Sequence, residues 1–73
     1  MSEELLIQLG QHISLKIKAK FKSTLDFSYA CDVDEASLRR IIKGKQNFSI
    51  KIFQKICNAL DIKMSELLSE LNL

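Results

Sequence analysis

Four cationic side chains lie close together in the middle of this 73-residue chain: Arg39, Arg40, Lys43 and Lys45. Their guanidinium and ammonium groups donate hydrogen bonds and accept none, so they can hold anionic oxygens such as those of phosphates. A guanidinium can also donate two parallel hydrogen bonds to the O6 and N7 atoms of guanine. Helical spacing puts both arginines on the face opposite the apolar Leu38 and Ile41. The cluster therefore predicts a surface that binds an anionic partner.

The formal net charge is only +2, but the charges are unevenly distributed. Five acidic residues lie toward the two ends of the chain, and the other four are Asp26, Asp32, Asp34 and Glu35. Two basic clusters occupy the centre, and this distribution fits an anionic partner better than the total charge does. A second basic cluster precedes the first and consists of Lys16, Lys18, Lys20 and Lys22. We interpret this lysine cluster as a solvated helix face, with a phosphate-binding role as the alternative.

The arginines need a helix to present them, and the sequence predicts one over residues 35–43. Asp34 can cap its beginning, and Gly44 stands where the end of a helix favours positive φ. A preceding helix is predicted over 24–31 with Ser23 as its cap, and Asp32 is expected to be left-handed in the turn between the two helices. Two short helices joined by a tight turn can place the second helix in the major groove of DNA.

Helical spacing of apolar residues predicts three further helices, over 3–20, over 50–60 and in a short segment around Ser65. The alternating stretch 15–22 could instead form a strand, but no hairpin turn follows it and a lone strand has no partner. Ile50, Phe53, Ile56 and Leu60 are expected to face inward. The fold class is therefore all-α, a five-helix bundle forming a single domain over residues 1–73.

Catalytic and metal-binding residues are scarce in this sequence. His12 is the single histidine, no nucleophile stands beside a base, and no glycine-rich phosphate loop occurs, so we expect no enzyme, no metal and no cofactor. Cys31 and Cys57 are expected to be buried free thiols in a reducing cytoplasm. No stretch approaches the roughly 20 apolar residues of a membrane span. Without a basic leader at the N-terminus, we expect a cytoplasmic protein with no membrane partner and no small-molecule ligand.

The chain resembles a known family along nearly its whole length. The residues that carry the resemblance are Leu9 to Ile13, Ser23 and Thr24, Val33 and Asp34, Ile41, Lys43 to Lys45, and Ile56 to Leu60. They resemble the Cro/cI-type helix-turn-helix domains of the lambda-repressor-like, xenobiotic-response-element family. The segment from Lys45 to Leu60 is similar to the small dimeric controller proteins of restriction–modification systems. The resemblance implies a five-helix DNA-binding bundle of bacterial or phage origin, associated with the nucleoid.

The resemblance also assigns roles in binding double-stranded DNA, with 35–43 as the recognition helix. Glu35 could accept a hydrogen bond from cytosine N4 or repel a phosphate, Ala36 could touch only a thymine methyl, and Arg40 could bind guanine. Arg39 could read bases or bind phosphate. The implied base-reading residues are Glu35, Ala36, Ser37 and Arg40, and the implied phosphate-binding residues are Thr24, Arg39, Lys43, Lys45 and Asn47.

The chain departs from the family at two positions. The family commonly pairs an arginine at position 17 with a glutamate at position 42, and here both are isoleucine. A buried ion pair can be replaced by packed apolar residues without loss of stability when both partners change. We therefore predict that Ile17 and Ile42 contact each other.

The function predicted from the resemblance is a sequence-specific DNA-binding transcriptional regulator, a repressor or controller protein, that binds a palindromic operator as a homodimer. The expected dimer interface is the last helix, through Leu67, Leu68, Leu71 and Leu73. The alternative is a protein-interaction module, antitoxin-like or an adaptor, with the same fold and weak or no DNA binding. The low net charge, Glu35 at a groove-facing position and the absent arginine at position 17 favour that alternative.

Overall fold

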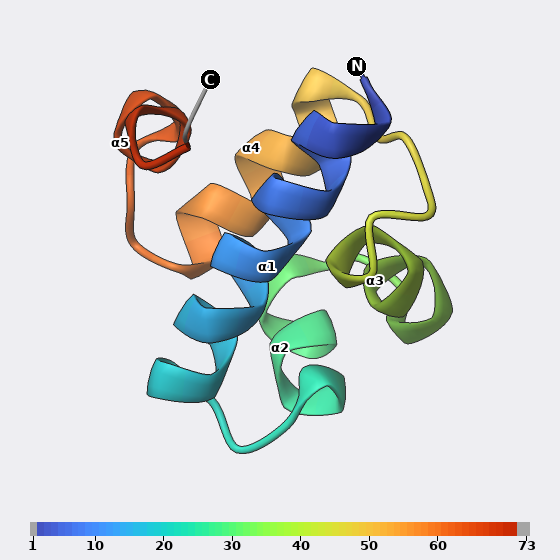
Figure 1. Cartoon of the computed structure of the whole chain (residues 1–73). Helices are drawn as coiled ribbons and strands as arrows, with labels where there is room; N and C mark the ends of the chain where they lie inside the picture. The colour runs from blue at the N-terminus through green and yellow to red at the C-terminus, as the bar shows by residue number, and fades with distance from the viewer. Residues whose placement is uncertain (1, 72–73) are drawn as a thin grey trace.

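Polar side chains begin four of the five helices in the described residues. Ser2, Ser23, Asp34 and Ser49 each accept a hydrogen bond from the backbone N–H three residues further on, which satisfies a donor that the first turn leaves free. The computed structural model describes residues 2–71. Its helices are α1 (Glu3–Lys20), α2 (Thr24–Cys31), α3 (Glu35–Ile42), α4 (Ile50–Ala59) and α5 (Met64–Ser69) (Figure 1).

The predicted boundaries of α1 and α2 are confirmed, and the strand alternative over 15–22 is wrong. The third and fourth helices each end one residue earlier than predicted, because Lys43 and Leu60 serve as their C-caps. Ser65 lies inside the fifth helix, and the cap before that helix is Lys63. The left-handed conformation predicted for Asp32 is confirmed at φ 56°, and Gly44 has φ 72°.

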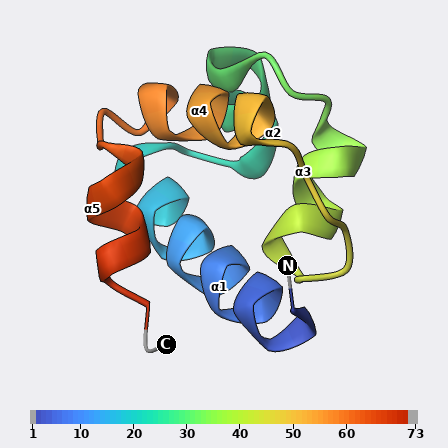
Figure 2. The ribbon, with the colours of Figure 1, turned by 90° about the horizontal axis from the view of Figure 1, so that it is seen from above.

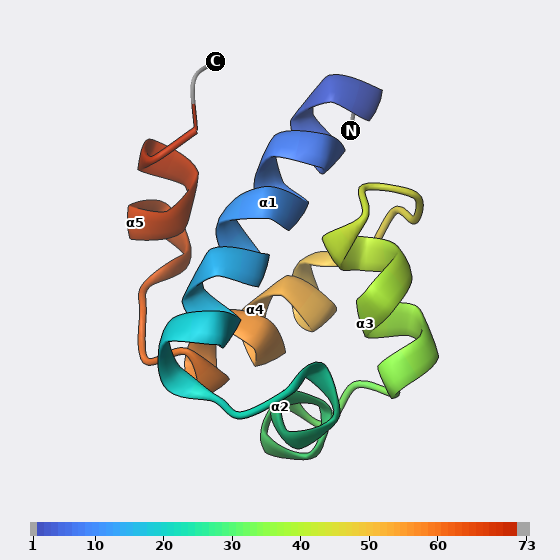
Figure 3. The same cartoon turned by 60° about the horizontal axis from the view of Figure 1, so that its bottom comes forward.

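The two central helices separate the two flanks of the molecule. Figure 2 shows α1 and α4 between α3 on one side and α5 on the other, and α2 lies below them in Figure 3. The described part of the chain measures 29 × 22 × 21 Å. All five helices contribute to one apolar core, whose fully buried members include Leu9, Phe27, Leu38, Ile56 and Leu67.

Ile50 is a correction to the predicted core, because 70% of it is exposed to solvent. It fits the apolar stripe of α4 by spacing, but it is the first residue of that helix and lies beyond the edge of the core. Ile17 is buried, and Ile42 packs against the same core cluster. Membership of one cluster does not establish that the two side chains touch, and their direct contact stays a prediction. Both cysteines are buried free thiols, and burial raises the pKa of the Cys57 thiol to about 11.

The end of α3 lies against α1 at two glycines. A Cβ atom on Gly10 would lie 2.6 Å from the carbonyl oxygen of Ile41 and nearer still to that of Ile42. A Cβ atom on Gly44 would lie 2.7 Å from the Cα atom of Ile7, and the positive φ of Gly44 also disfavours any other residue. Backbone therefore meets backbone at Gly10, with no room for a side chain.

Polar contacts hold the C-terminal part of the chain on α1. Glu70 accepts from Lys16 Nζ at 2.9 Å and lies 3.2 Å from His12 Nδ1. These contacts, the lysine hydrogen bond first, lower the pKa of Glu70. Lys20 Nζ donates to the carbonyl oxygen of Leu60 at 2.6 Å, which satisfies one acceptor at the end of α4. Two of the four lysines in the cluster, Lys16 and Lys20, thus form hydrogen bonds within the fold. The interpretation of the cluster as a solvated helix face did not predict these bonds.

No helix within residues 2–71 has the length and apolar character needed to span a membrane.

We expect Gly10→Ala to lower the free energy of unfolding, because the new methyl group forces α1 and α3 apart at a cost of roughly 1–3 kcal/mol. This loss should exceed the gain of about 1 kcal/mol that alanine brings to a helix interior. Urea unfolding followed by circular dichroism measures it. Gln11→Ala, on the exposed face of the same helix, is the matched control and should change stability little. A Gly10→Ala variant as stable as the parent would contradict the close approach.

Candidate nucleic-acid interface

The turn between α2 and α3 sets the direction in which α3 leaves the core. Asp32 adopts the left-handed conformation, and the N–H of Val33 donates to the carbonyl oxygen of Ser28 at 3.3 Å. Val33 is buried, and Lys55 on α4 holds Asp32 through its carbonyl oxygen at 3.4 Å and its carboxylate at 3.6 Å. The turn is therefore tied both to the helix before it and to the core.

The helix α3 has one buried face and one exposed face, as predicted. Leu38 and Ile41 are buried, whereas Ala36, Arg39 and Arg40 are exposed. Asp34 caps the helix and accepts from the Ser37 N–H at 3.0 Å. This backbone hydrogen bond, and then one from the Ser37 hydroxyl, lower the pKa of Asp34. The exposed face is the only face of α3 that a partner can reach without unfolding the domain.

The side chain of Arg40 is held by two neighbours. Its Nε donates to Gln46 Oε1 at 2.6 Å, and its Nη2 donates to Ser37 Oγ at 3.3 Å. Gln46 reaches Arg40 because the chain reverses at Gly44, after which the Lys45 N–H donates to the Arg40 carbonyl oxygen at 2.9 Å. Sequence reasoning placed Ser37 and Arg40 in the site and missed Gln46. The reversal predicted at Gly44 is the signal that could have found it.

Arg39 and Glu35 form an ion pair on the same exposed face. Arg39 Nη2 lies 2.9 Å from Glu35 Oε2, one helical turn apart. The pairing offsets the negative charge of Glu35 near the beginning of α3, and it also occupies part of the Arg39 guanidinium. The two arginines therefore differ in their direct partners. Arg39 pairs with a carboxylate, whereas Arg40 donates to two neutral groups and meets the Asp34 carboxylate only through charge.

Four of the five predicted phosphate-binding residues lie outside α3, and the fifth, Arg39, lies on it. Lys43, Lys45 and Asn47 are exposed at the end of α3 and in the segment before α4, and Thr24 is the first residue of α2. The structure thus puts exposed hydrogen-bond donors at the end of α3 and in the segment after it, and the Thr24 hydroxyl at the start of α2. Their binding of phosphate stays a prediction.

Of the leucines expected at a dimer interface, the structure leaves Leu68 exposed. Leu67 and Leu71 are buried in the core of the same chain, whereas Leu68 is 41% exposed, and Leu73 lies outside the described residues. Leu67 on α5 and Leu71 beyond its end both pack inward, whereas the neighbouring Leu68 falls on the outer side of α5. A partner could reach only Leu68 of the three without displacing the core.

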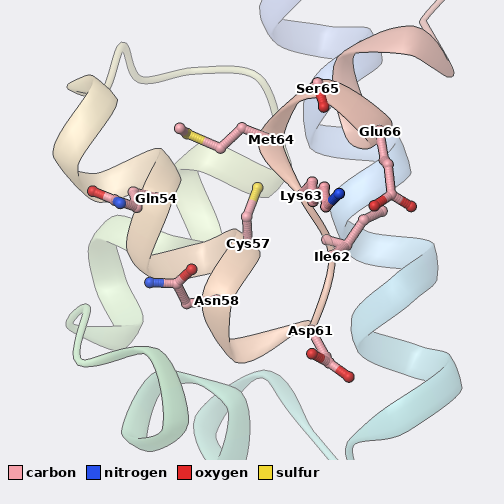
Figure 4. A pocket seen from close by; sticks show the side chains of 9 residues that line it. All are labelled: Gln54, Cys57, Asn58, Asp61, Ile62, Lys63, Met64, Ser65 and Glu66. Atoms are coloured by element: carbon pink, nitrogen blue, oxygen red, sulfur yellow. The ribbon is translucent and has the colours of Figure 1, made fainter.

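An open groove of about 830 Å³ runs between α4 and the segment leading into α5 (Figure 4). The Cys57 thiol in its wall is protonated at neutral pH because its pKa is raised to about 11, so it is a poor nucleophile. No group of three metal-ligating side chains occurs in residues 2–71. The groove is lined by Gln54, Cys57, Asn58, Asp61, Ile62, Lys63, Met64, Ser65 and Glu66.

Comparison with protein families and solved structures places this architecture among known ones. A family model described as the Cro/C1-type HTH DNA-binding domain matches residues 12–69. The search of curated proteins found no match for the chain.

Two solved structures share the fold. One is the restriction-modification controller protein C.AhdI from Aeromonas hydrophila, with a TM-score of 0.80 and 27% identity over 85% of this chain and 94% of that one. The other is the clp gene regulator ClgR from C. glutamicum, with a TM-score of 0.83 and 21% identity over 90% of this chain and 85% of that one. The predicted five-helix, lambda-repressor-like fold class is confirmed.

The Asp34 cap gives α3 a pH dependence that can be measured. Because the folded pKa of Asp34 lies below its ordinary value, its stabilisation is fully present above that value and is lost as the pH falls through the folded pKa. We expect Asp34→Asn, which keeps a neutral cap, to lose less unfolding free energy than the parent between about pH 5 and about pH 2. Urea unfolding at each pH measures the difference. Parallel pH profiles would contradict it, and the acid response of Glu70 cancels because both proteins share it.

Proposed function

The chain belongs to the Cro/C1-type helix-turn-helix DNA-binding family, and on that premise we propose that it regulates transcription by binding a palindromic operator as a homodimer. The helix α3 enters the major groove, where its exposed face meets the edges of the bases. The C.AhdI protein, similar over most of this chain, is a controller of a restriction–modification system. A role in controlling gene expression fits that similarity.

The observation that carries the proposal is the exposed face of α3, where Arg40 is held ready on a helix whose other face is buried. Arg40 reads guanine through two parallel hydrogen bonds, and Ala36 touches a thymine methyl group. Glu35, paired with Arg39, accepts from cytosine, and Ser37 supports Arg40. The residues proposed to bind phosphate and fix the register are Thr24, Arg39, Lys43, Lys45 and Asn47.

Dimerisation follows from the small size of the reading surface. One module makes too few contacts for tight specific binding, and pairing on a two-fold symmetric site doubles them. Two recognition helices in successive major grooves lie roughly 34 Å apart, so each lies about 17 Å from the two-fold axis between the copies. A domain measuring 29 × 22 × 21 Å that carries α3 on one flank is wide enough to span that distance. The opposite flank, with Leu68 exposed on α5, is the proposed contact between two copies.

Selection of bound sequences from a random duplex pool tests the base-reading role of Arg40. We expect a palindrome for the parent, and we expect Arg40→Ala to weaken binding by about 1–3 kcal/mol in each half-site and to relax the preference at one base pair of each half-site. Lys45→Ala, the matched control, should weaken all sequences alike and reduce the salt slope by about 2, because each of the two copies loses one phosphate contact.

An Arg40→Ala variant with unchanged affinity and preference would overturn the assignment of the reading face. If the parent binds no duplex even at low salt, the proposed function fails and the protein-interaction alternative is favoured, because groove binding predicts strong binding there.

Sedimentation equilibrium tests the dimer contact. We expect Leu68→Asp to raise the dimer dissociation constant roughly tenfold or more, because it puts a charge into an apolar contact. Leu25→Asp is the matched control, since Leu25 on α2 is 42% exposed and Leu68 is 41% exposed. The control should dimerise as the parent does. A monomeric parent, or equal dimerisation of both variants, would contradict the proposal.

A further inference from the structure

We infer that Gln46 is a positioning residue that sets base specificity through Arg40, and this inference rests on the proposed function. Gln46 lies outside α3, in the segment between Gly44 and α4. It is half-buried, and its side-chain oxygen faces the guanidinium of Arg40 at 2.6 Å. Reading by α3 therefore depends on a residue that the helix itself does not contain.

The contacts of Arg40 determine which of its donors a base can use. A guanidinium carries five N–H groups, and here the Nε proton goes to Gln46 Oε1 while one Nη2 proton goes to Ser37 Oγ. The two Nη1 protons and the second Nη2 proton remain free to donate to a base. Guanine offers two acceptors, O6 and N7, side by side in the major groove. Arg40 therefore meets guanine end-on, through Nη1 and Nη2, with its Nε edge turned toward Gln46.

The backbone keeps Gln46 in place. The Gly44 N–H donates to the Ile41 carbonyl oxygen at 3.0 Å, and the Lys45 N–H donates to that of Arg40 at 2.9 Å. These bonds close the turn after α3, and the packing of Gly44 on Ile7 anchors the turn to α1. Gln46 thus approaches Arg40 from a fixed support. A long arginine side chain held at two points loses less conformational freedom when it meets its base.

The chemistry of the amide suits this role. Its carbonyl oxygen accepts from Arg40 without bringing a negative charge to a surface that must approach phosphates. Arg39 is the contrast, because its partner Glu35 is a carboxylate 2.9 Å away. Neither hydrogen-bond partner of Arg40 is charged, and the Asp34 carboxylate attracts Arg40 through its charge. The remaining N–H groups of Arg40 are available to the acceptors of a guanine.

Two substitutions of Gln46 distinguish a role in positioning Arg40 from a general contribution to DNA affinity. Gln46→Met keeps the length of the side chain and removes the acceptor, whereas Gln46→Glu keeps an acceptor and adds a charge. We expect Gln46→Met to lower discrimination roughly five- to tenfold at the base pair that Arg40→Ala also affects, and at no other. We expect Gln46→Glu to keep that discrimination and to lose affinity for all sequences alike. Duplex selection followed by affinity measurement on single-base variants of the site gives both numbers.

A double variant completes the test. If Gln46 acts through Arg40, the double variant Arg40→Ala with Gln46→Met should discriminate no worse than Arg40→Ala alone. Additive losses, an unchanged base profile in Gln46→Met, or a uniform loss of affinity in that variant would each overturn the inference. A parent that binds no duplex would instead overturn the proposed function. Circular dichroism and thermal melting of each variant show that the fold is retained, as expected for a side chain outside the core cluster.

Discussion

The packing of α3 on α1 without intervening side chains is the constraint on which the rest of the structure depends. At Gly10 the carbonyl oxygens of Ile41 and Ile42 come close to the α1 backbone, and at Gly44 the turn after α3 rests on Ile7. Side-chain packing tolerates small shifts, but a contact between backbones leaves little freedom. The end of α3 therefore has a defined place relative to the core, and so does the segment that follows it.

The two flanks of the molecule are held by different forces. The helix α3 is fixed by this backbone contact, by the buried Leu38 and Ile41, and by the turn at Asp32. The C-terminal segment also packs through Leu67 and Leu71, but its link to α1 includes the exposed ion pair of Glu70 with Lys16 and the contact of Glu70 with His12. Exposed pairs are weak and are screened by salt.

The helices and the turn could be predicted from the sequence because local chemistry decides them. Ser2, Ser23, Asp34 and Ser49 cap helices through side chains three residues from their donors, and Asp32 is one of the few residue types that tolerate a left-handed turn. Such interactions span a few residues, so they are visible in the sequence.

Features that depend on distant parts of the chain could not be predicted in the same way. The apolar spacing of Ile50 suggested burial, but the edge of the core is set by the whole bundle. Leu67, Leu68 and Leu71 looked alike until the docking of α5 distinguished the inner from the outer side. Gln46 was missed because its role depends on the path of the chain after Gly44, and the resemblance that supplied the other site residues does not extend to side-chain partners.

The division of α3 into a buried face and an exposed face has a consequence for how such a protein diverges. Leu38 and Ile41 carry the stability of the helix, so residues on the outer face can be exchanged without endangering the fold. With the outer face reading bases as proposed, new target sequences are accessible by few mutations. Arg40 is the exception, because a replacement would leave Gln46 facing an unsuitable neighbour. Divergence at Arg40 should therefore be accompanied by a change at Gln46. Duplicated copies of the gene would acquire separate DNA targets by changing both residues.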